Sequence, residues 1–143
     1  MFTLAGERLQ AIAALDVSPQ EKIDRAIEAM TAFIEEHDSF PAIMLREVAD
    51  RGAHLDRVTF AALGAVPRTF GAIVAEGVAA GAFRPVHPVF TYFSMVAPVV
   101  FYLAGAPIRR EISDLHVADM RGPSPSAFIA HVQEAMRRTL APS

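Results

Sequence analysis

Two histidines, each followed three residues later by a carboxylate, are the first groups in this sequence that could do chemistry. His116 precedes Asp119, and His131 precedes Glu134, so each pair could share one face of a helix. A di-metal site in a helical bundle needs Glu-x-x-His on two helices and further glutamates, and this chain has neither. We interpret both pairs as surface polar pairs, and predict no metal site and no cofactor.

The other reactive side chains form no recognisable catalytic set. Cysteine is absent, which excludes a disulfide scaffold, a thiolate metal site and a cysteine nucleophile. The sequence contains no phosphate-binding glycine loop, no Gly-x-Ser-x-Gly and no His-Glu-x-x-His. His37 and His54 are expected at helix ends, where an imidazole commonly bonds a backbone group, although a ligand contact is an alternative. We predict no catalytic residue.

Large, deformable apolar side chains spread over four predicted helices are more informative. They would either pack as a solid core or line an apolar pocket for a hydrophobic or aromatic ligand, with tyrosine hydroxyls or His37 as polar contacts. Helical periodicity does not separate these alternatives. The candidate ligand-binding residues are Met30, Phe33, His37, Met44, Phe60, Phe70, Tyr92, Phe93, Met95 and Tyr102.

Length and composition indicate one globular domain over residues 1–143. The chain is 52% hydrophobic with a formal net charge of −3, which excludes intrinsic disorder. It carries no basic excess of the kind that binds nucleic acid. Twelve arginines accompany one lysine, which we interpret as the codon bias of a GC-rich genome.

The elements that must position these residues are all helical. Apolar residues recur at helical spacing, and no alternating run is long enough for a strand. Ser18-Pro19 and Ser124-Pro125 carry helix-start chemistry, with a serine cap and proline in the first turn. We expect an all-α bundle of six or seven helices, over residues 2–15, from Ser18 to a break at Asp38–Pro41, and over 41–51, 56–80, 88–104 and 125–140, with a surface loop over 113–124.

Proline and glycine set the expected breaks. Pro67 lies inside a helical pattern and is expected to kink that helix or split it in two. Gly81 is expected to end the same helix as a left-handed cap, with Phe83 packing back. Gly105 and Pro107 are expected to close the following helix.

That following helix belongs to a stretch with no charged side chain, from Pro85 to Ile108. The stretch is long enough to span a bilayer, but four prolines and several polar residues oppose this. A helix that is apolar all round can equally be a central or interface helix of a bundle. No signal peptide is predicted, and we favour a cytoplasmic protein without membrane contact.

The segment Phe70–Pro85, FGAIVAEGVAAGAFRP, resembles a passage of TetR-type (tetracycline-repressor-like) transcriptional regulators, in which a helix leads into Glu-Gly, small residues, Gly and Phe-Arg. Residues 18–23 and 40–47 resemble the first helix and the short second segment of that family's regulatory domain. Residues 88–104 and 128–140 resemble its dimer-forming pair. The resemblance covers essentially the whole chain.

The resemblance implies a ligand-sensing and homodimerisation domain. In such proteins a small molecule enters a cavity and favours one arrangement of the dimer, which changes the spacing of two DNA-reading heads. The dimer is a two-fold four-helix bundle, here from 88–104 and 125–140, with one side of 88–104 facing the pocket and the other the partner. The implied interface residues are Val96, Val100, Leu103, Phe128, Val132, Ala135 and Met136.

The family's N-terminal helix-turn-helix is not present in this sequence, which resembles the family from partway along the connecting helix. We therefore expect no direct DNA contact by this chain, and operator binding only through that absent domain. Two alternatives stay open. One is a stand-alone helical enzyme or binding protein for an apolar small molecule, using His37, Glu76 or Tyr102. The other is a membrane or lipid-surface protein built around 85–108.

Overall fold

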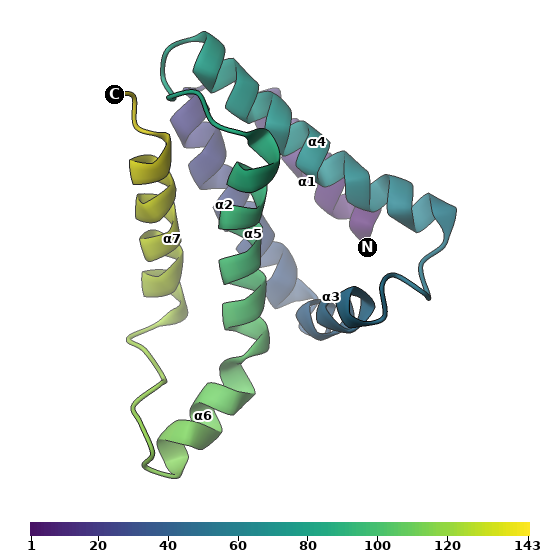
Figure 1. The fold of residues 1–143 in the computed structure, drawn as a ribbon, viewed down its shortest axis with the longest axis vertical. Helices are drawn as coiled ribbons and strands as arrows, with labels where there is room; N and C mark the ends of the chain where they lie inside the picture. The colour runs from purple at the N-terminus through teal and green to yellow at the C-terminus, as the bar shows by residue number, and fades with distance from the viewer.

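The chain folds into seven α-helices without a β-strand, in a computed structural model that describes all of residues 1–143 (Figure 1). The predicted all-α class is confirmed. The helices are α1 (Phe2–Ala13), α2 (Pro19–Glu36), α3 (Phe40–Ala49), α4 (Arg57–Ala79), α5 (Pro88–Ala104), α6 (Ala106–Asp114) and α7 (Pro125–Leu140).

Side-chain caps start the helices that the sequence marks most clearly. The Ser18 hydroxyl accepts a hydrogen bond from the Glu21 amide at 3.2 Å, and the Ser124 hydroxyl accepts one from the Ala127 amide at 3.1 Å. Each serine satisfies an amide that has no partner inside its helix. Asp56 does the same for α4, where its carboxyl accepts from the Thr59 amide at 2.7 Å. Hydrogen bonding from the Thr59 side chain and then from its amide lowers the pKa of the Asp56 carboxyl below the usual value.

The end of α4 has the predicted glycine cap. Gly81 adopts a left-handed φ of 73°, and the amides of Ala82 and Gly81 donate to the carbonyls of Gly77 and Val78. This pair of bonds is a Schellman motif. The buried Phe83 ring covers Gly77 so closely that an added Cβ would lie 2.0 Å from it. The cap therefore turns the chain back onto α4 before α5 begins.

Two helix boundaries differ from expectation. α4 is not split at Pro67 but continues through it as one helix, because losing a single backbone bond does not outweigh the packing of the rest of the helix. α5 ends at Ala104 with Gly105 as its cap, as expected, but an unexpected helix, α6, follows directly with Pro107 in its first turn, bent by 50° from α5. Proline lacks only a donor that a first turn does not use, so Pro107 starts α6 instead of ending α5.

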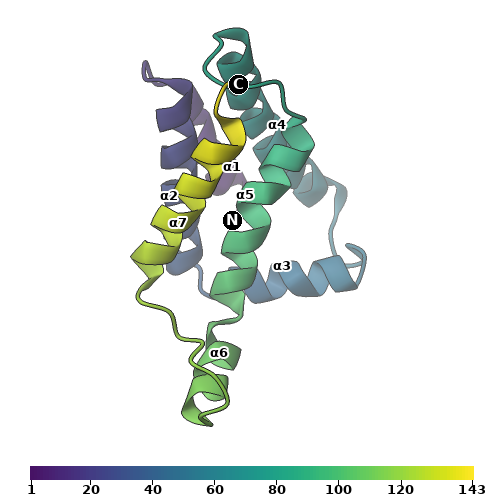
Figure 2. The same cartoon turned by 60° about the vertical axis from the view of Figure 1, so that its left-hand side comes forward.

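The hydrophobic core lies between α2, α4, α5 and α7. Its fully buried side chains include Ile23, Ile27, Phe70, Ile73, Val74, Val99, Met136 and Leu140. α1 packs along α4 on the far side from α7, and α5 and α7 lie side by side (Figure 2). α6 extends from the end of α5, away from the bundle, and buries no residue.

The uncharged stretch from 85 to 108 does not form one straight helix. α5 and α6 are long and apolar enough to cross a membrane only as a pair bent by 50°. α4 passes the same test by itself, as core helices of soluble proteins also do. Length and composition therefore give only weak evidence for a membrane span.

Candidate functional site

α5 has two apolar faces, and only one is covered. Thr91, Met95 and Val99 follow one another at four-residue intervals and are buried against the core. The Thr91 hydroxyl donates to the His87 carbonyl at 2.9 Å, so its polar atom is satisfied inside the helix. This inner face fixes α5 on the bundle.

The opposite face of α5 carries aromatic rings in water. Phe90, Phe93 and Phe101 are 71%, 57% and 72% exposed. With the exposed Ala97 between them, their spacing of three, four and four residues places them on one side of the helix. A contiguous exposed apolar patch of this kind marks an interaction surface. We call these four residues the α5 outer face.

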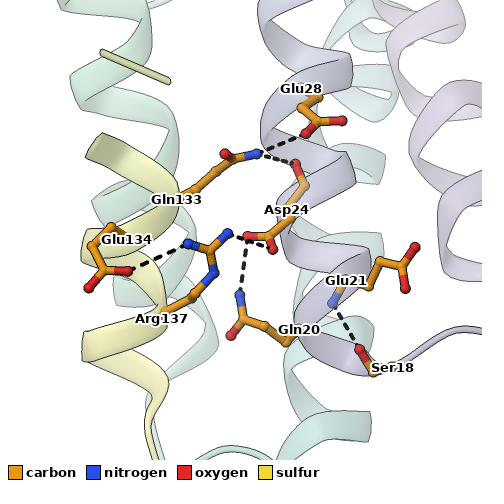
Figure 3. Close-up of polar contacts among 8 residues, drawn as sticks. All are labelled: Ser18, Gln20, Glu21, Asp24, Glu28, Gln133, Glu134 and Arg137. Atoms are coloured by element: carbon orange, nitrogen blue, oxygen red, sulfur yellow. Dashed lines mark hydrogen bonds and ion pairs between the residues drawn. The ribbon is translucent and has the colours of Figure 1, made fainter. Parts of the chain in front are cut away.

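α7 is held beside α5 by a polar network to α2 (Figure 3). Asp24 of α2 accepts from Arg137 at 3.0 Å and from Gln20 at 3.2 Å. The Gln133 amide donates to the Asp24 carbonyl at 3.2 Å and to Glu28 at 3.1 Å. The bond to Asp24 raises the pKa of Arg137 above its usual value. We call this network the α2–α7 clasp.

Stacked rings hold the other side of α7. Tyr102 of α5 lies flat on Phe128 of α7, with ring centroids 3.8 Å apart and planes 11° from parallel. The Arg109 guanidinium covers the other face of Tyr102 at 3.6 Å and donates to the Tyr102 carbonyl. The stack joins the beginning of α6 to α5 and α7.

The residues predicted for the dimer interface separate into three sets. Val132 and Met136 are buried in the core of the single chain, at 4% and 2% exposure. Ala135 is exposed. The remainder are half-buried and pack against the core, namely Val96, Val100, Leu103 and Phe128. Phe93 belongs to the predicted ligand residues, and Phe90 and Phe101 are not among the residues predicted for the interface. Their spacing was the signal that could have identified them.

Part of the predicted ligand set is core. Phe33, Phe70 and Met95 are buried at 3%, 0% and 3% exposure. Phe33 stacks on His37 with centroids 4.4 Å apart, and the His37 Nδ1 lies 2.9 Å from the Phe33 carbonyl oxygen. This contact agrees with the structural interpretation of His37 at a helix end.

Tyr92 is the predicted ligand residue with unused polar capacity. Its half-buried ring meets Phe70 at 5.7 Å and Phe93 at 5.4 Å, both edge to face. Its hydroxyl makes no hydrogen bond within the chain, unlike the Tyr102 hydroxyl, which reaches the Arg121 carbonyl at 3.5 Å. A tyrosine hydroxyl is protonated near neutrality and can donate, and burial raises the pKa of Tyr92 further above its ordinary value.

The remaining predicted ligand residues do not join Tyr92 in one cluster. Phe60 is 51% exposed and lies against Gly52, while Met30 and Met44 are half-buried. Two surface depressions lie elsewhere. One of about 410 Å³ is lined by Ile43, Arg46, Glu47, Asp50 and His54. The other, of about 380 Å³, follows α2 and α7 and includes Thr31, Ile129 and Gln133.

The groups considered for catalysis lie in separate contacts. His37 stacks on Phe33, Tyr102 lies between Phe128 and Arg109, and Glu76 forms an ion pair with Lys22 at 2.9 Å. No group of three or more histidine or carboxylate side chains is arranged to hold a metal ion. His37, Glu76 and Tyr102 therefore form no acid–base pair with one another.

Comparison with known families agrees with the all-helical fold. The model of the tetracyclin repressor-like C-terminal domain matches residues 19–124. The chain belongs to this family. The matched region of this TetR-like domain runs from the first residue of α2 to the cap of α7, and so includes α5 and the α5 outer face.

Domains of this family are regulatory and not enzymatic. They typically dimerise and bind small-molecule effectors. The matched region contains no helix-turn-helix domain. A comparison of this chain with curated proteins gives no significant match.

Proposed function

We propose that this TetR-like chain is the effector-sensing and homodimerisation domain of a cytoplasmic transcriptional regulator. A small hydrophobic or aromatic effector would bind to it and change DNA binding by a helix-turn-helix domain outside this sequence. The α5 outer face carries the proposal, because it exposes Phe90, Phe93 and Phe101 on one helix without a charge.

A second copy of the chain is the partner that best fits this face. In a two-fold dimer the same patch meets itself, so each apolar side chain must find an uncharged surface opposite. α5 has no charged residue, and self-association would therefore leave no charge unpaired at its centre. α7 would supply the rim through Ala135 and its exposed polar neighbours.

Tyr92 supports the sensing half of the proposal. Its unpaired hydroxyl and half-buried ring give one polar contact in an aromatic setting, beside Phe70 and Phe93. Ligand sites of this kind are mostly apolar with a few placed polar groups. Since Phe93 also belongs to the α5 outer face, an effector that contacts Tyr92 would lie next to the proposed partner surface.

The first test is the solution mass of the chain, measured by light scattering after size exclusion at several concentrations. We expect a mass near twice 15.5 kDa. Phe93→Arg should give a folded monomer, because it places two like charges at a desolvated centre. Val58→Arg is the matched control, since Val58 is 78% exposed on α4, and this variant should stay dimeric. A monomeric wild type would contradict the dimer and favour a stand-alone helical bundle.

Effector sensing has its own test. A panel of apolar and aromatic compounds is screened for a rise in Tm with the wild type. A genuine effector should raise the Tm less in Tyr92→Phe, which removes the hydroxyl and keeps the ring. Release of a chemically changed compound would identify an enzyme, because a sensor returns its ligand unaltered.

A further inference from the structure

The only lysine of the chain is buried at a junction of three helices. Lys22 lies in the first turn of α2 and is 5% exposed. Its Nζ donates to the Ala13 carbonyl at 2.8 Å and to the two Glu76 carboxylate oxygens at 3.1 and 2.9 Å. An ammonium group has three donors, so every donor of Lys22 has an acceptor.

The two groups that accept from Lys22, the Ala13 carbonyl and the Glu76 carboxylate, both lie at helix C-termini. Ala13 is the last residue of α1, and Glu76 lies in the last turn of α4. The two helix ends meet the start of α2 at the same end of the bundle (Figure 1). C-terminal ends carry partial negative charge and favour cations, whereas a lysine near the start of its own helix is disfavoured. The charge of Lys22 therefore stabilises the C-terminal ends of α1 and α4, and it does not stabilise the start of its own helix, α2.

The chemistry of this junction suits lysine and not arginine. Three acceptors converge on one nitrogen, which matches the compact ammonium group, whereas a guanidinium spreads its donors in a flat fork. The chain uses arginine at all twelve other basic positions. The one exception is the one site where a point charge is required.

α1 packs along α4 and α2, but only two of its residues, Gly6 and Leu9, are buried. The one ion pair that α1 itself forms, Arg8–Glu36 at 2.5 Å, is exposed, so the bond from Lys22 to Ala13 is its one buried polar tie to the bundle. We propose that the Lys22 junction is a latch, which keeps α1 on the bundle and whose opening releases α1 alone while the other helices stay folded. Elements of low local stability open as separate units. This inference concerns the domain itself and does not depend on an effector or a dimer.

Hydrogen exchange read by mass spectrometry tests the latch. In Lys22→Met, amides of α1 should exchange at least tenfold faster than in the wild type, while α7 amides change less than twofold. Arg8→Met is the matched control, because it removes the exposed ion pair of the same helix, and should accelerate α1 exchange less than threefold. Equal acceleration in α1 and α7, or no acceleration in α1, would overturn the proposal, as would an equal effect of Arg8→Met.

Two milder variants keep the test decisive if Lys22→Met does not fold. Glu76→Gln removes one charge at a half-exposed position and leaves the bond to Ala13 possible, and should give a smaller acceleration confined to α1 and the end of α4. Lys22→Arg keeps the charge but loses the point geometry, and should also accelerate α1 exchange. Unchanged α1 exchange in both variants contradicts the latch.

Because the chain has a single lysine, the rate of its chemical labelling tests the latch in the wild-type protein. Lys22 is the one lysine side chain that an amine-reactive reagent can label in residues 1–143. Labelling requires its nitrogen to leave three acceptor atoms, so it should be at least tenfold slower in the folded chain than in the chain unfolded in urea, and it should follow the opening rate of α1. Equally fast labelling of Lys22 in the folded and unfolded chains would show that the latch is not closed in solution.

Discussion

α5 and α7 are adjacent helices of similar length, but the rest of the chain covers the apolar side chains of α7 and leaves several large ones of α5 exposed. α7 buries Val132, Met136 and Leu140 and carries Glu134 and Arg138 in water. α5 buries an equal stripe but exposes Phe90, Phe93 and Phe101 on its other side. The difference indicates that α7 is mainly a structural helix of the chain, and it is the reason why we propose α5 as the helix through which the chain dimerises.

The largest effect in this comparison of α5 and α7 is expected from a substitution that leaves a cavity under α7. Met136→Ala should lower the free energy of unfolding by about 2–5 kcal/mol, because Met136 is 2% exposed and its loss leaves a cavity in the core. Urea denaturation at several protein concentrations measures this. The loss should be the same at every concentration, since Met136 lies within one protomer. A loss that varies with concentration would place Met136 at an interface instead.

Phe101→Ala should behave in the opposite way. Phe101 is 72% exposed in the protomer, so its removal costs the isolated fold little. At a dimer interface a large aromatic side chain contributes about 2 kcal/mol or more, and stability coupled to association depends on concentration. The Tm of the wild type should rise with concentration, and that of Phe101→Ala should rise less. Identical concentration dependence would remove Phe101 from the interface.

The two helices also differ at their first residues. Ser124 caps α7 through the Ala127 amide, whereas His87 at the start of α5 makes no side-chain cap bond. Ser124→Ala should therefore lower the free energy of unfolding by about 1 kcal/mol. His87→Ala is the control, with an expected change within about 0.5 kcal/mol. Equal losses in the two variants would show that the serine hydroxyl is not what stabilises α7.

The same contrast explains which features could be predicted from the sequence. In α7 the charged residues identify the outside, so periodicity alone places Val132 and Met136 on the inside. In α5 every position is uncharged, and periodicity cannot say which apolar face the protomer covers. Val132 and Met136 were expected at the interface, but they belong to the apolar stripe that α7 buries against the core of its own chain.

Other features depended on contacts between distant parts of the chain. α6 was missed because Gly105 and Pro107 stop a helix in one context and start one in another, and only the geometry of the turn decides. The lone lysine appeared as a matter of composition, but its role depends on two helix ends that lie 9 and 54 residues away in sequence. Caps, by contrast, are local, and Ser18, Gly81 and Ser124 were correctly predicted.

The smallest expected effect tests how α7 is held on α2, on the side of α7 that does not face α5. Arg137 is an exposed member of the α2–α7 clasp, bonded to Asp24 at 3.0 Å and to Glu134 at 3.5 Å. Arg137→Ala should lower the Tm less than Ser124→Ala does, and the difference from wild type should disappear at about 1 M salt, where screening acts over roughly 3 Å. Arg138→Ala is the control, because Arg138 is exposed and pairs only within α7, and should change the Tm less still. If high salt leaves the effect of Arg137→Ala unchanged, then packing of its aliphatic stem on α2 holds the helices together, and not the ion pair.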